Sequence, residues 1–429
     1  MSREQPVSRS TLPGEDDITR VELDNGIIVL TRPNFNSPSA IITGYLPSGG
    51  LFDLDEKLGL AYFSSLALMR GCEGRSFQEI YDTLESIGAS LGFSVSVHNT
   101  SFGGRALVED LPKIMNVFSD CLRCPTFPPE QIERLRYQLL TSLAIRNQST
   151  SQLASMAFDE IVFRGHPYGR PEDGHPETIQ NIFREDLVNF HKKHFGPANM
   201  VIVIVGAVSP EEAVELVEGV LGDWENPGVD SPPLPEITLL EKSVRRHIDV
   251  PGKVQTNLVM GTIGPKRRSD DYLPASLGNN ILGQFGLMGR IGDVVREKEG
   301  LAYYASTSLS AWIESGSWEV SAGVNPKNLQ RAIDLIISEL ERFVHEKVSL
   351  EEISDSQSNF IGRLPLSMES NLGVASALLR LERFQLGLDY YRQYPRMVRE
   401  VTPELILEIA RRYLDTEKLC TISAGPESE

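Results

Sequence analysis

The feature that most constrains the fold of this chain is a repeat of its elements at a constant spacing. A helix that precedes an apolar strand ends near His194 in the first half and near Tyr413 in the second. The strands that follow end at Gly206 and Gly425, and these two glycines have the same separation along the chain as His194 and Tyr413. A constant offset across a helix and a strand indicates an internal duplication. The 429 residues are therefore expected to form two homologous halves.

Hydrophobic periodicity predicts the same order of elements in both halves. In the first half we expect strands at Val21–Leu23, Ile27–Leu30 and Ala40–Tyr45, a helix at Gly59–Met69, strands at Leu91–Val97 and Ser101–Val108, helices at Leu111–Leu122, Glu130–Arg146 and Arg184–His194, and a strand at Met200–Val205. In the second half we expect strands at Leu301–Leu309 and Ser317–Gly323, helices at Leu329–Phe343, Leu350–Phe360 and Leu405–Tyr413, and a strand at Leu419–Ser423.

The distribution of prolines predicts where the halves are joined. Four prolines lie within Glu225–Pro235, a density typical of an extended linker. The prediction is a disordered tail at 1–19, an N-terminal domain at 20–224, a linker at 225–239 and a C-terminal domain at 240–429. Strands grouped before helices predict two α+β domains, each an antiparallel-rich sheet with helices packed on one side.

Composition excludes several classes of protein. The formal net charge of −18 disfavours nucleic acids and anionic membranes as main partners, because both would repel the chain. The strongest apolar run, Met200–Val208, is far shorter than the roughly 18 residues of a membrane span. No signal-peptide pattern is visible, and four cysteines are typical of a reduced, cytoplasmic protein. Cys121 and Cys124 form a lone C-x-x-C motif without a second ligand pair, so both thiols are expected to be structural.

Several stretches of the sequence are similar to one superfamily of enzymes. They are Gly59-Leu-Ala-Tyr-Phe-Ser-Ser-Leu66, His166-Pro-Tyr-Gly-Arg-Pro171, Phe195-Gly-Pro-Ala-Asn199 and Gly289-Arg-Ile-Gly-Asp-Val-Val-Arg-Glu-Lys-Glu-Gly-Leu-Ala-Tyr303. With these motifs the chain resembles the insulinase/pitrilysin/mitochondrial-processing-peptidase superfamily of inverzincin zinc peptidases over residues 20–425. The resemblance implies paired domains that form half of a clamshell around a peptide-sized chamber.

The zinc-binding motif of that superfamily is missing from this chain. The motif is H-x-x-E-H on one helix, in which two histidines bind zinc and the glutamate acts as general base. A further glutamate later in the chain completes the zinc site. The resemblance places these positions on Tyr62, Ser65, Leu66 and Ser142, and none of the four side chains is an ionised ligand or a strong base at neutral pH. No metal or cofactor is therefore expected in this chain.

The other half of the superfamily's active site is retained. The resemblance implies an arginine and, seven residues later, a tyrosine that face the zinc across the cleft, and Arg296 and Tyr303 have that spacing. A short helix is expected at Ile291–Lys298, immediately before the tyrosine. A guanidinium and a phenol both donate hydrogen bonds, which suits them to a peptide carbonyl and to the oxyanion formed during hydrolysis. A shift of register onto Arg290 and Tyr304 stays open.

These motifs favour one hypothesis of function and leave two alternatives. The favoured one is a non-catalytic, substrate-binding subunit of a heteromeric zinc metallopeptidase, inactive alone. Its expected partners are a peptide substrate and a homologous subunit that carries zinc on an intact H-x-x-E-H motif. The first alternative is a structural or assembly protein without a proteolytic role. The second is an independent enzyme with a serine nucleophile such as Ser64 or Ser65, although no G-x-S-x-G turn supports it.

Overall fold

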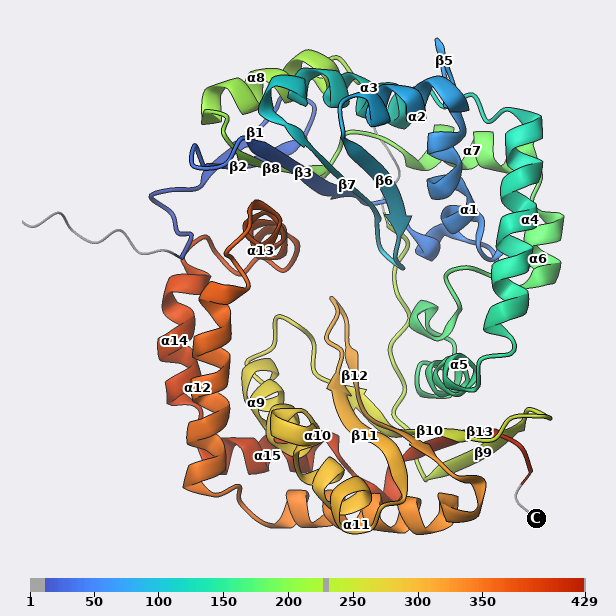
Figure 1. Ribbon diagram of the computed structural model, residues 1–429, viewed down its shortest axis with the longest axis vertical. Coiled ribbons are helices and arrows are strands. Elements are labelled where there is room, and N and C mark those ends of the chain that lie inside the picture. Colours follow the sequence, from blue (N-terminus) through green and yellow to red (C-terminus); the bar gives the residue numbers. More distant parts are fainter. Residues whose placement is uncertain (1–11, 227–230, 428–429) are drawn as a thin grey trace, which may run out of the picture.

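A computed structural model describes residues 12–226 and 231–427, and it contains two large β-sheets, one from each half of the chain (Figure 1). The first has six strands in the order β1-β2-β8-β3-β7-β6, and the second has five in the order β11-β12-β10-β13-β9. The strands of the first sheet are β1 Thr19–Glu22, β2 Ile28–Pro33, β3 Ser39–Leu46, β6 Ser90–Val95, β7 Thr100–Leu107 and β8 Val201–Gly206. Those of the second are β9 Val244–Asp249, β10 Thr256–Gly264, β11 Ala302–Leu309, β12 Gly316–Val324 and β13 Cys420–Gly425, and a small hairpin joins β4 Gly71–Cys72 to β5 Arg75–Ser76.

The two sheets have the same topology, which confirms the predicted duplication. Reading β2-β8-β3-β7-β6 against β9-β13-β10-β12-β11 matches five strands of each sheet, and only the first pair in each series is parallel. Strand β1, at the edge of the first sheet, has no counterpart in the second sheet. Strands β8 and β13 are equal in length, and both their first and their last residues keep the constant spacing found in the sequence. The predicted α+β class with two homologous domains is therefore confirmed.

Most of the helices cover the outer faces of the sheets. The helices of the first half are α1 Leu60–Ala67, α2 Phe77–Ser86, α3 Leu111–Arg123, α4 Pro129–Arg146, α5 Thr150–Val162, α6 Pro176–Asn181, α7 Arg184–His194 and α8 Pro210–Leu221. Those of the second half are α9 Tyr272–Gly283, α10 Phe285–Gly292, α11 Leu329–His345, α12 Leu350–Leu366, α13 Asn371–Arg383, α14 Tyr390–Glu400 and α15 Pro403–Tyr413. The predicted stripe on α3, from Leu111 to Leu122, is buried in the first core, where Phe118 lies against Phe102 of β7.

One helix of each half is exchanged with the other half. Helix α13 packs on the inner face of the first sheet, against Val201, Val203 and Val205 of β8. Helix α5 packs on the inner face of the second sheet, where Phe158 is fully buried beside Ile422. Figure 1 shows these two helices lying between the sheets. Because each sheet is completed by a helix from the other half, the two domains are interlocked.

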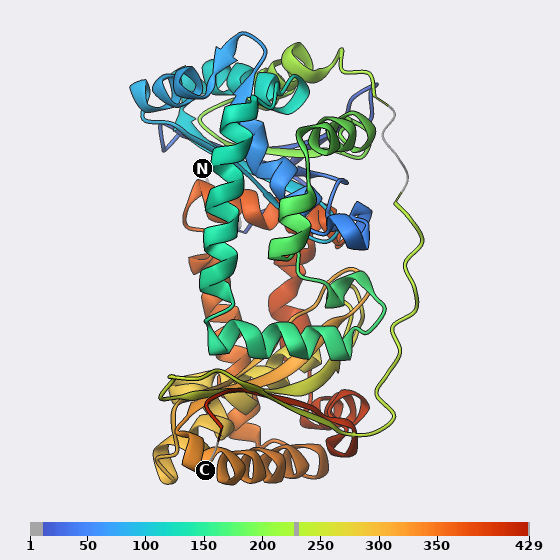
Figure 2. The ribbon, with the colours of Figure 1, turned by 90° about the vertical axis from the view of Figure 1, so that its right-hand side faces the viewer.

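The linker and the tail complete the fold. Residues 231–240 have no regular structure, and Figure 2 shows this segment running along one side of the molecule from the first domain to the second. Residues 1–11 of the predicted tail and 227–230 of the predicted linker lie outside the described residues. Residues 12–18, which the prediction placed in the tail, lie against the second half of the chain. Arg392 of α14 forms an ion pair with Asp16 and donates to the Leu12 carbonyl at 3.2 Å.

Within the described part of the chain, no helix is long and apolar enough to cross a membrane.

Candidate functional site

Helix α1 carries three of the four positions that the superfamily uses for zinc. Its first turn is fixed by Asp53, whose carboxylate accepts the amide protons of Gly59 and Ala61, both at 2.9 Å. Gly59 has a φ of +93°, a left-handed conformation that glycine adopts without strain. The helix is shorter than the predicted Gly59–Met69, because its last residues tighten into a 3₁₀ turn at Leu68–Arg70. The backbone scaffold of the motif is thus intact.

The side chains on this scaffold do not fit a zinc ion. Ser65 is buried, and its hydroxyl donates to the Tyr62 carbonyl at 2.8 Å. Tyr62 and Leu66 are half-buried, and Ser142 is exposed on α4. Zinc requires imidazole, thiolate or carboxylate ligands, and these four positions supply none. Nor do the residues with described positions contain any other group of three histidine, cysteine or acidic side chains placed to hold a metal.

We predict that the purified chain binds less than a tenth of a zinc ion per molecule after mild dialysis. The reason is the donor chemistry of Tyr62, Ser65, Leu66 and Ser142, which offers no charged or imidazole ligand. Elemental analysis by mass spectrometry measures the zinc content, and a catalytically intact relative serves as the positive control. One tightly held zinc ion that is lost when Ser65 or Ser142 is substituted would contradict the prediction.

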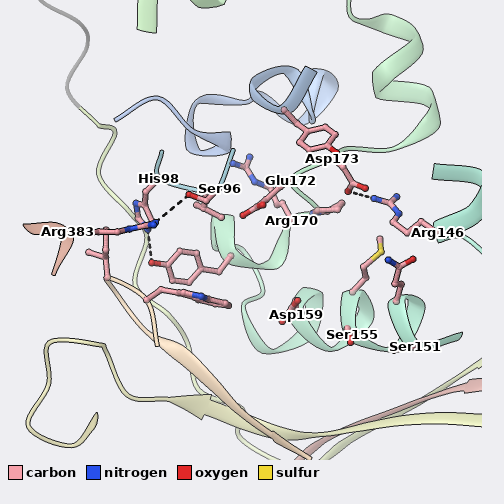
Figure 3. A pocket seen from close by; sticks show the side chains of 18 of the residues that line it. Ser96, His98, Arg146, Ser151, Ser155, Asp159, Arg170, Glu172, Asp173 and Arg383 are labelled. Carbon is pink, nitrogen blue, oxygen red and sulfur yellow. Dashed lines mark hydrogen bonds and ion pairs between the residues drawn. The ribbon is translucent and has the colours of Figure 1, made fainter. Parts of the chain in front are cut away.

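A cavity of about 710 Å³ lies beside α1, between the two domains. It is bounded by the tip of the β6–β7 hairpin, by α5, by the segment around Glu172, by the tip of the β11–β12 hairpin and by the end of α13 (Figure 3). Its lining comprises Tyr62, Ser96, Val97, His98, Arg146, Ser151, Gln152, Ser155, Met156, Asp159, Tyr168, Arg170, Pro171, Glu172, Asp173, Trp312, Ile313, Arg383 and Phe384. The exchanged helices α5 and α13 therefore both contribute to a cavity between the domains that is lined by apolar and charged side chains.

Burial shifts the titration of groups in this cavity. The pKa of Asp159 rises to about 7, because the carboxyl is desolvated and Glu319 and Glu172 lie close to it. The pKa of His98 falls to about 4 through burial and the nearby Arg383, so this imidazole is neutral at pH 7. Its Nε2 atom lies 2.7 Å from the Tyr168 hydroxyl, which also accepts the Glu314 amide proton at 3.2 Å. These bonds join the hairpin tips of the two domains.

Arg296 lies in an irregular turn near the end of a helix. The predicted helix Ile291–Lys298 is in fact the last turn of α10 followed by a π-helical turn, Asp293–Lys298. The turn ends before Gly300, whose φ is +62°. The Arg296 side chain is 36% exposed, and its closest carboxylate is that of the neighbouring Glu297, at 3.6 Å. An exposed ion pair of this length contributes little to stability.

Tyr303 lies at a β-bulge on the edge strand of the second sheet. Ala302 pairs with Val324 and Tyr304 pairs with Gly323, so Tyr303 is the extra residue between them. Its side chain is 84% exposed. Neither Tyr303 nor Arg296 is among the residues that line the cavity beside α1. The pair therefore belongs to a surface of the second domain, separate from the inherited zinc helix of the same chain.

The neighbouring residues Arg290 and Tyr304 have structural partners. Arg290 donates to both carboxylate oxygens of Glu352, at 2.6 and 2.7 Å, and only 13% of its side chain is exposed. The Tyr304 hydroxyl accepts the Asn257 side-chain amide at 2.7 Å. Both side chains are therefore already held within the second domain.

The sequence offered no direct signal for the buried charges of the cavity. Asp159 lies on the exchanged helix α5, and Arg383 ends the exchanged helix α13, neither of which was predicted. Both helices begin at a serine N-cap and end at a phenylalanine, at Ser149 and Phe163 for α5 and at Ser370 and Phe384 for α13. The two serines and the two phenylalanines have the same separation along the chain, and it is close to the separation of the duplicated strands. The repeat spacing could therefore have predicted α5 and α13 as a matching pair of helices.

Comparison with known proteins agrees with this geometry. Residues 28–173 match the family model described as insulinase (peptidase family M16), and residues 181–360 match the model described as the peptidase M16 inactive domain. The chain belongs to the insulinase family, peptidase family M16. The resemblance stated from the motifs is thereby confirmed, and this member carries the peptidase fold without the zinc motif.

Relatives and solved structures match the insulinase-family chain along nearly its whole length. An uncharacterized zinc protease of Mycobacterium leprae is 24% identical over 96% of this chain and 91% of its own. The mitochondrial-processing peptidase subunit beta of Saccharomyces cerevisiae is 25% identical over 86% of this chain and 83% of its own. The crystal structure of a peptidase M16 inactive domain from Pseudomonas fluorescens superposes with a TM-score of 0.88, at 24% identity, over 96% of this chain and 98% of that one. A protease from Helicobacter pylori superposes with a TM-score of 0.87, at 18% identity, over 97% of this chain and 100% of that one.

Proposed function

We propose that this chain is the non-catalytic, substrate-binding subunit of a heteromeric zinc metallopeptidase. The observation that carries the proposal is the contrast between two sites of one chain. The zinc helix keeps its scaffold but has Tyr62 and Leu66 in place of the two histidine ligands and Ser65 in place of the general base, while Arg296 and Tyr303 remain accessible. A partner subunit with an intact H-x-x-E-H motif would supply the zinc and the water that the metal activates. This chain would supply hydrogen-bond donors to the substrate.

The local backbone around the pair supports a role in binding. A π-helical turn and a β-bulge both sacrifice regular hydrogen bonding, and both occur often at functional sites. Here the π turn holds Arg296, and the bulge that follows holds Tyr303. The Tyr303 side chain on the edge strand is 84% exposed, so its apolar ring lies in water. Burial of this ring against a binding partner would be favourable in free energy.

The chemistry of the two side chains fits the oxyanion of peptide hydrolysis. The Arg296 guanidinium is permanently charged and presents its donors in a planar fork, and the Tyr303 hydroxyl supplies one further donor. Donors placed around a developing negative charge stabilise the transition state more than the ground state. One relative of this chain is named as a subunit of a processing peptidase, which supports a role within an assembly.

Reconstitution tests this proposal. We expect the purified chain to show negligible peptidase activity, and we expect activity to appear when it is mixed with a zinc-bearing family member from the same organism. Cleavage of a fluorogenic peptide library measures the activity, and size-exclusion chromatography measures assembly. The control is a Tyr62→His/Ser65→Glu/Leu66→His variant of this chain, assayed without the partner. It measures how much activity arises when the H-x-x-E-H motif is restored in this chain alone.

The alternative, a structural or assembly protein, predicts a different outcome. In that case a complex with the zinc-bearing relative would form without any gain in peptidase activity, or affinity purification from native lysate would recover no such relative. Either result would remove the support for a substrate-binding role of Arg296 and Tyr303.

A further inference from the structure

Three of the four cysteines lie together at the end of helix α3. Cys72 of β4 and Cys121 of α3 are buried in the first core, and Cys124 is the exposed residue that ends the helix. The sequence motif pairs Cys121 with Cys124, but the thiol of Cys121 forms its hydrogen bond with that of Cys72. The fold therefore brings into contact two free cysteines that are distant in the sequence.

Backbone pairing and an ion pair hold the two segments that carry these thiols against each other. Cys72 forms an antiparallel β-bridge with Pro125, and two backbone hydrogen bonds of 2.9 and 3.0 Å flank this bridge. Cys121 lies about one helical turn before Pro125. Arg75 of β5 forms an ion pair with Asp120, the residue before Cys121, and both side chains are partly exposed. The approach of the two sulfur atoms is thus fixed by contacts that do not involve the thiols, close to the surface.

Cys72 has the surroundings of a reactive thiolate. Its pKa is held below the usual value by the hydrogen bond from the Cys121 thiol and by the nearby Arg75, whose backbone amide also donates to the sulfur. The same thiol–thiol hydrogen bond, together with burial, raises the pKa of Cys121, so this residue keeps its proton. A thiolate in contact with a second thiol is the arrangement in which one sulfur attacks an oxidant and the other resolves the product.

The other two cysteines have the opposite surroundings. The pKa of Cys124 is raised by desolvation of its sulfur and by the nearby Glu73 carboxylate. The pKa of Cys420, in β13 of the second domain, rises to about 12 through burial and the nearby Asp159 and Glu319. Both residues therefore stay protonated at neutral pH, and a thiol reacts with oxidants far more slowly than a thiolate does.

We propose that Cys72 and Cys121 are a redox-sensitive pair that forms a reversible disulfide when the chain meets a hydroperoxide. The Cys72 thiolate attacks one peroxide oxygen, which forms a sulfur–oxygen bond, breaks the oxygen–oxygen bond and releases hydroxide. This hydroxide recovers the proton that Cys72 gave up. Cys121 then attacks the sulfur of the sulfenic acid, and the second hydroxide leaves with the Cys121 proton as water. Two thiols and one hydrogen peroxide thus give one disulfide and two water molecules, and the disulfide joins α3 to the segment that follows α1.

Peptide mapping of the full chain after treatment with hydrogen peroxide tests the proposal. The remaining thiols are alkylated, and trypsin then places Cys72, Cys121 and Cys124 on separate peptides, 71–75, 114–123 and 124–134. We expect a crosslink between 71–75 and 114–123 as the main product, and dithiothreitol should remove it by thiol–disulfide exchange. Cys72 should be consumed at least about tenfold faster than Cys420, because the rate follows the thiolate fraction. The proposal is wrong if 114–123 is crosslinked to 124–134 instead, if Cys72 is consumed without a crosslink, or if Cys72 reacts no faster than Cys420.

Single variants assign the roles of the two sulfur atoms. Cys121→Ala should abolish the crosslink and let Cys72 proceed to the sulfinic acid, which dithiothreitol does not reduce, because the resolving thiol is absent. Cys72→Ala should abolish the crosslink and slow the oxidation of Cys121. The matched control is Cys124→Ser, which removes the exposed cysteine of the motif and should leave the crosslink unchanged. If an alanine variant does not fold, the peptide map of the unaltered chain still decides the matter. The pair uses neither Arg296 nor Tyr303, so the result does not depend on the proposed role in a heteromeric peptidase.

Discussion

Replacing Tyr303 by phenylalanine is expected to lower the kcat of the reconstituted peptidase complex by about 100- to 1000-fold. The change removes one hydroxyl donor and keeps the ring, and loss of a single preorganised donor to an oxyanion typically costs about 3–4 kcal/mol of transition-state stabilisation. Folding should be unaffected, because the Tyr303 side chain is 84% exposed. Arg296→Lys keeps the charge and loses the planar fork, so it should also impair turnover. Steady-state kinetics with size-exclusion chromatography separate turnover from assembly.

Tyr304→Phe is the matched control for this experiment. Its hydroxyl accepts a hydrogen bond from Asn257, so the variant should lose about 1–2 kcal/mol of stability while turnover stays within about twofold. If Tyr303→Phe and Arg296→Lys both leave kcat within about twofold of the parent complex, the pair has no role in the reaction. The proposed function would then give way to the structural alternative.

The second large effect concerns the exchanged helices. Phe158→Ala on α5 is expected to lower the free energy of unfolding by about 3–5 kcal/mol, because a fully buried phenylalanine leaves a cavity. The loss should be felt in the second domain, since Phe158 packs against the sheet that contains β10 and β13. Denaturant unfolding measures the free energy, and hydrogen exchange measures the protection of β10 and β13.

Leu378→Ala on α13 is the reciprocal variant. It should cost about 2–5 kcal/mol and reduce protection in β3 and β8 of the first sheet. Tyr137→Ala, at a 69% exposed site on α4, is the control and should change stability by less than about 0.5 kcal/mol. If Phe158→Ala reduces protection only in the first sheet, the two domains are not interlocked through this helix.

Much of the fold could be predicted because its signals are local. The helix predicted at Glu130–Arg146 is observed at Pro129–Arg146, one residue longer at its start, because a proline fits the first helical position and need not precede the helix. Helix α5 was missed, although its start is marked by the N-cap Ser149 and its length is ordinary. Its apolar face packs on β10 and β13 of the other half of the chain, and periodicity alone does not indicate which sheet a helix covers. The β-bulge at Tyr303 was also missed, because a bulge depends on register with the neighbouring strand.

The sequence by itself determined that two homologous domains are present and that the four zinc-site positions carry no ligands. The first follows from a constant spacing along the chain. The second follows from the resemblance to the superfamily, which places the zinc site on Tyr62, Ser65, Leu66 and Ser142, and from the chemistry of these side chains. Only the tertiary structure decided that α5 and α13 exchange sheets and that Arg383 faces a cavity with Asp159 and Glu172. The physical reason is range: donor chemistry and helical periodicity belong to single residues or short segments, whereas burial and charge pairing depend on contacts between residues in opposite halves of the chain.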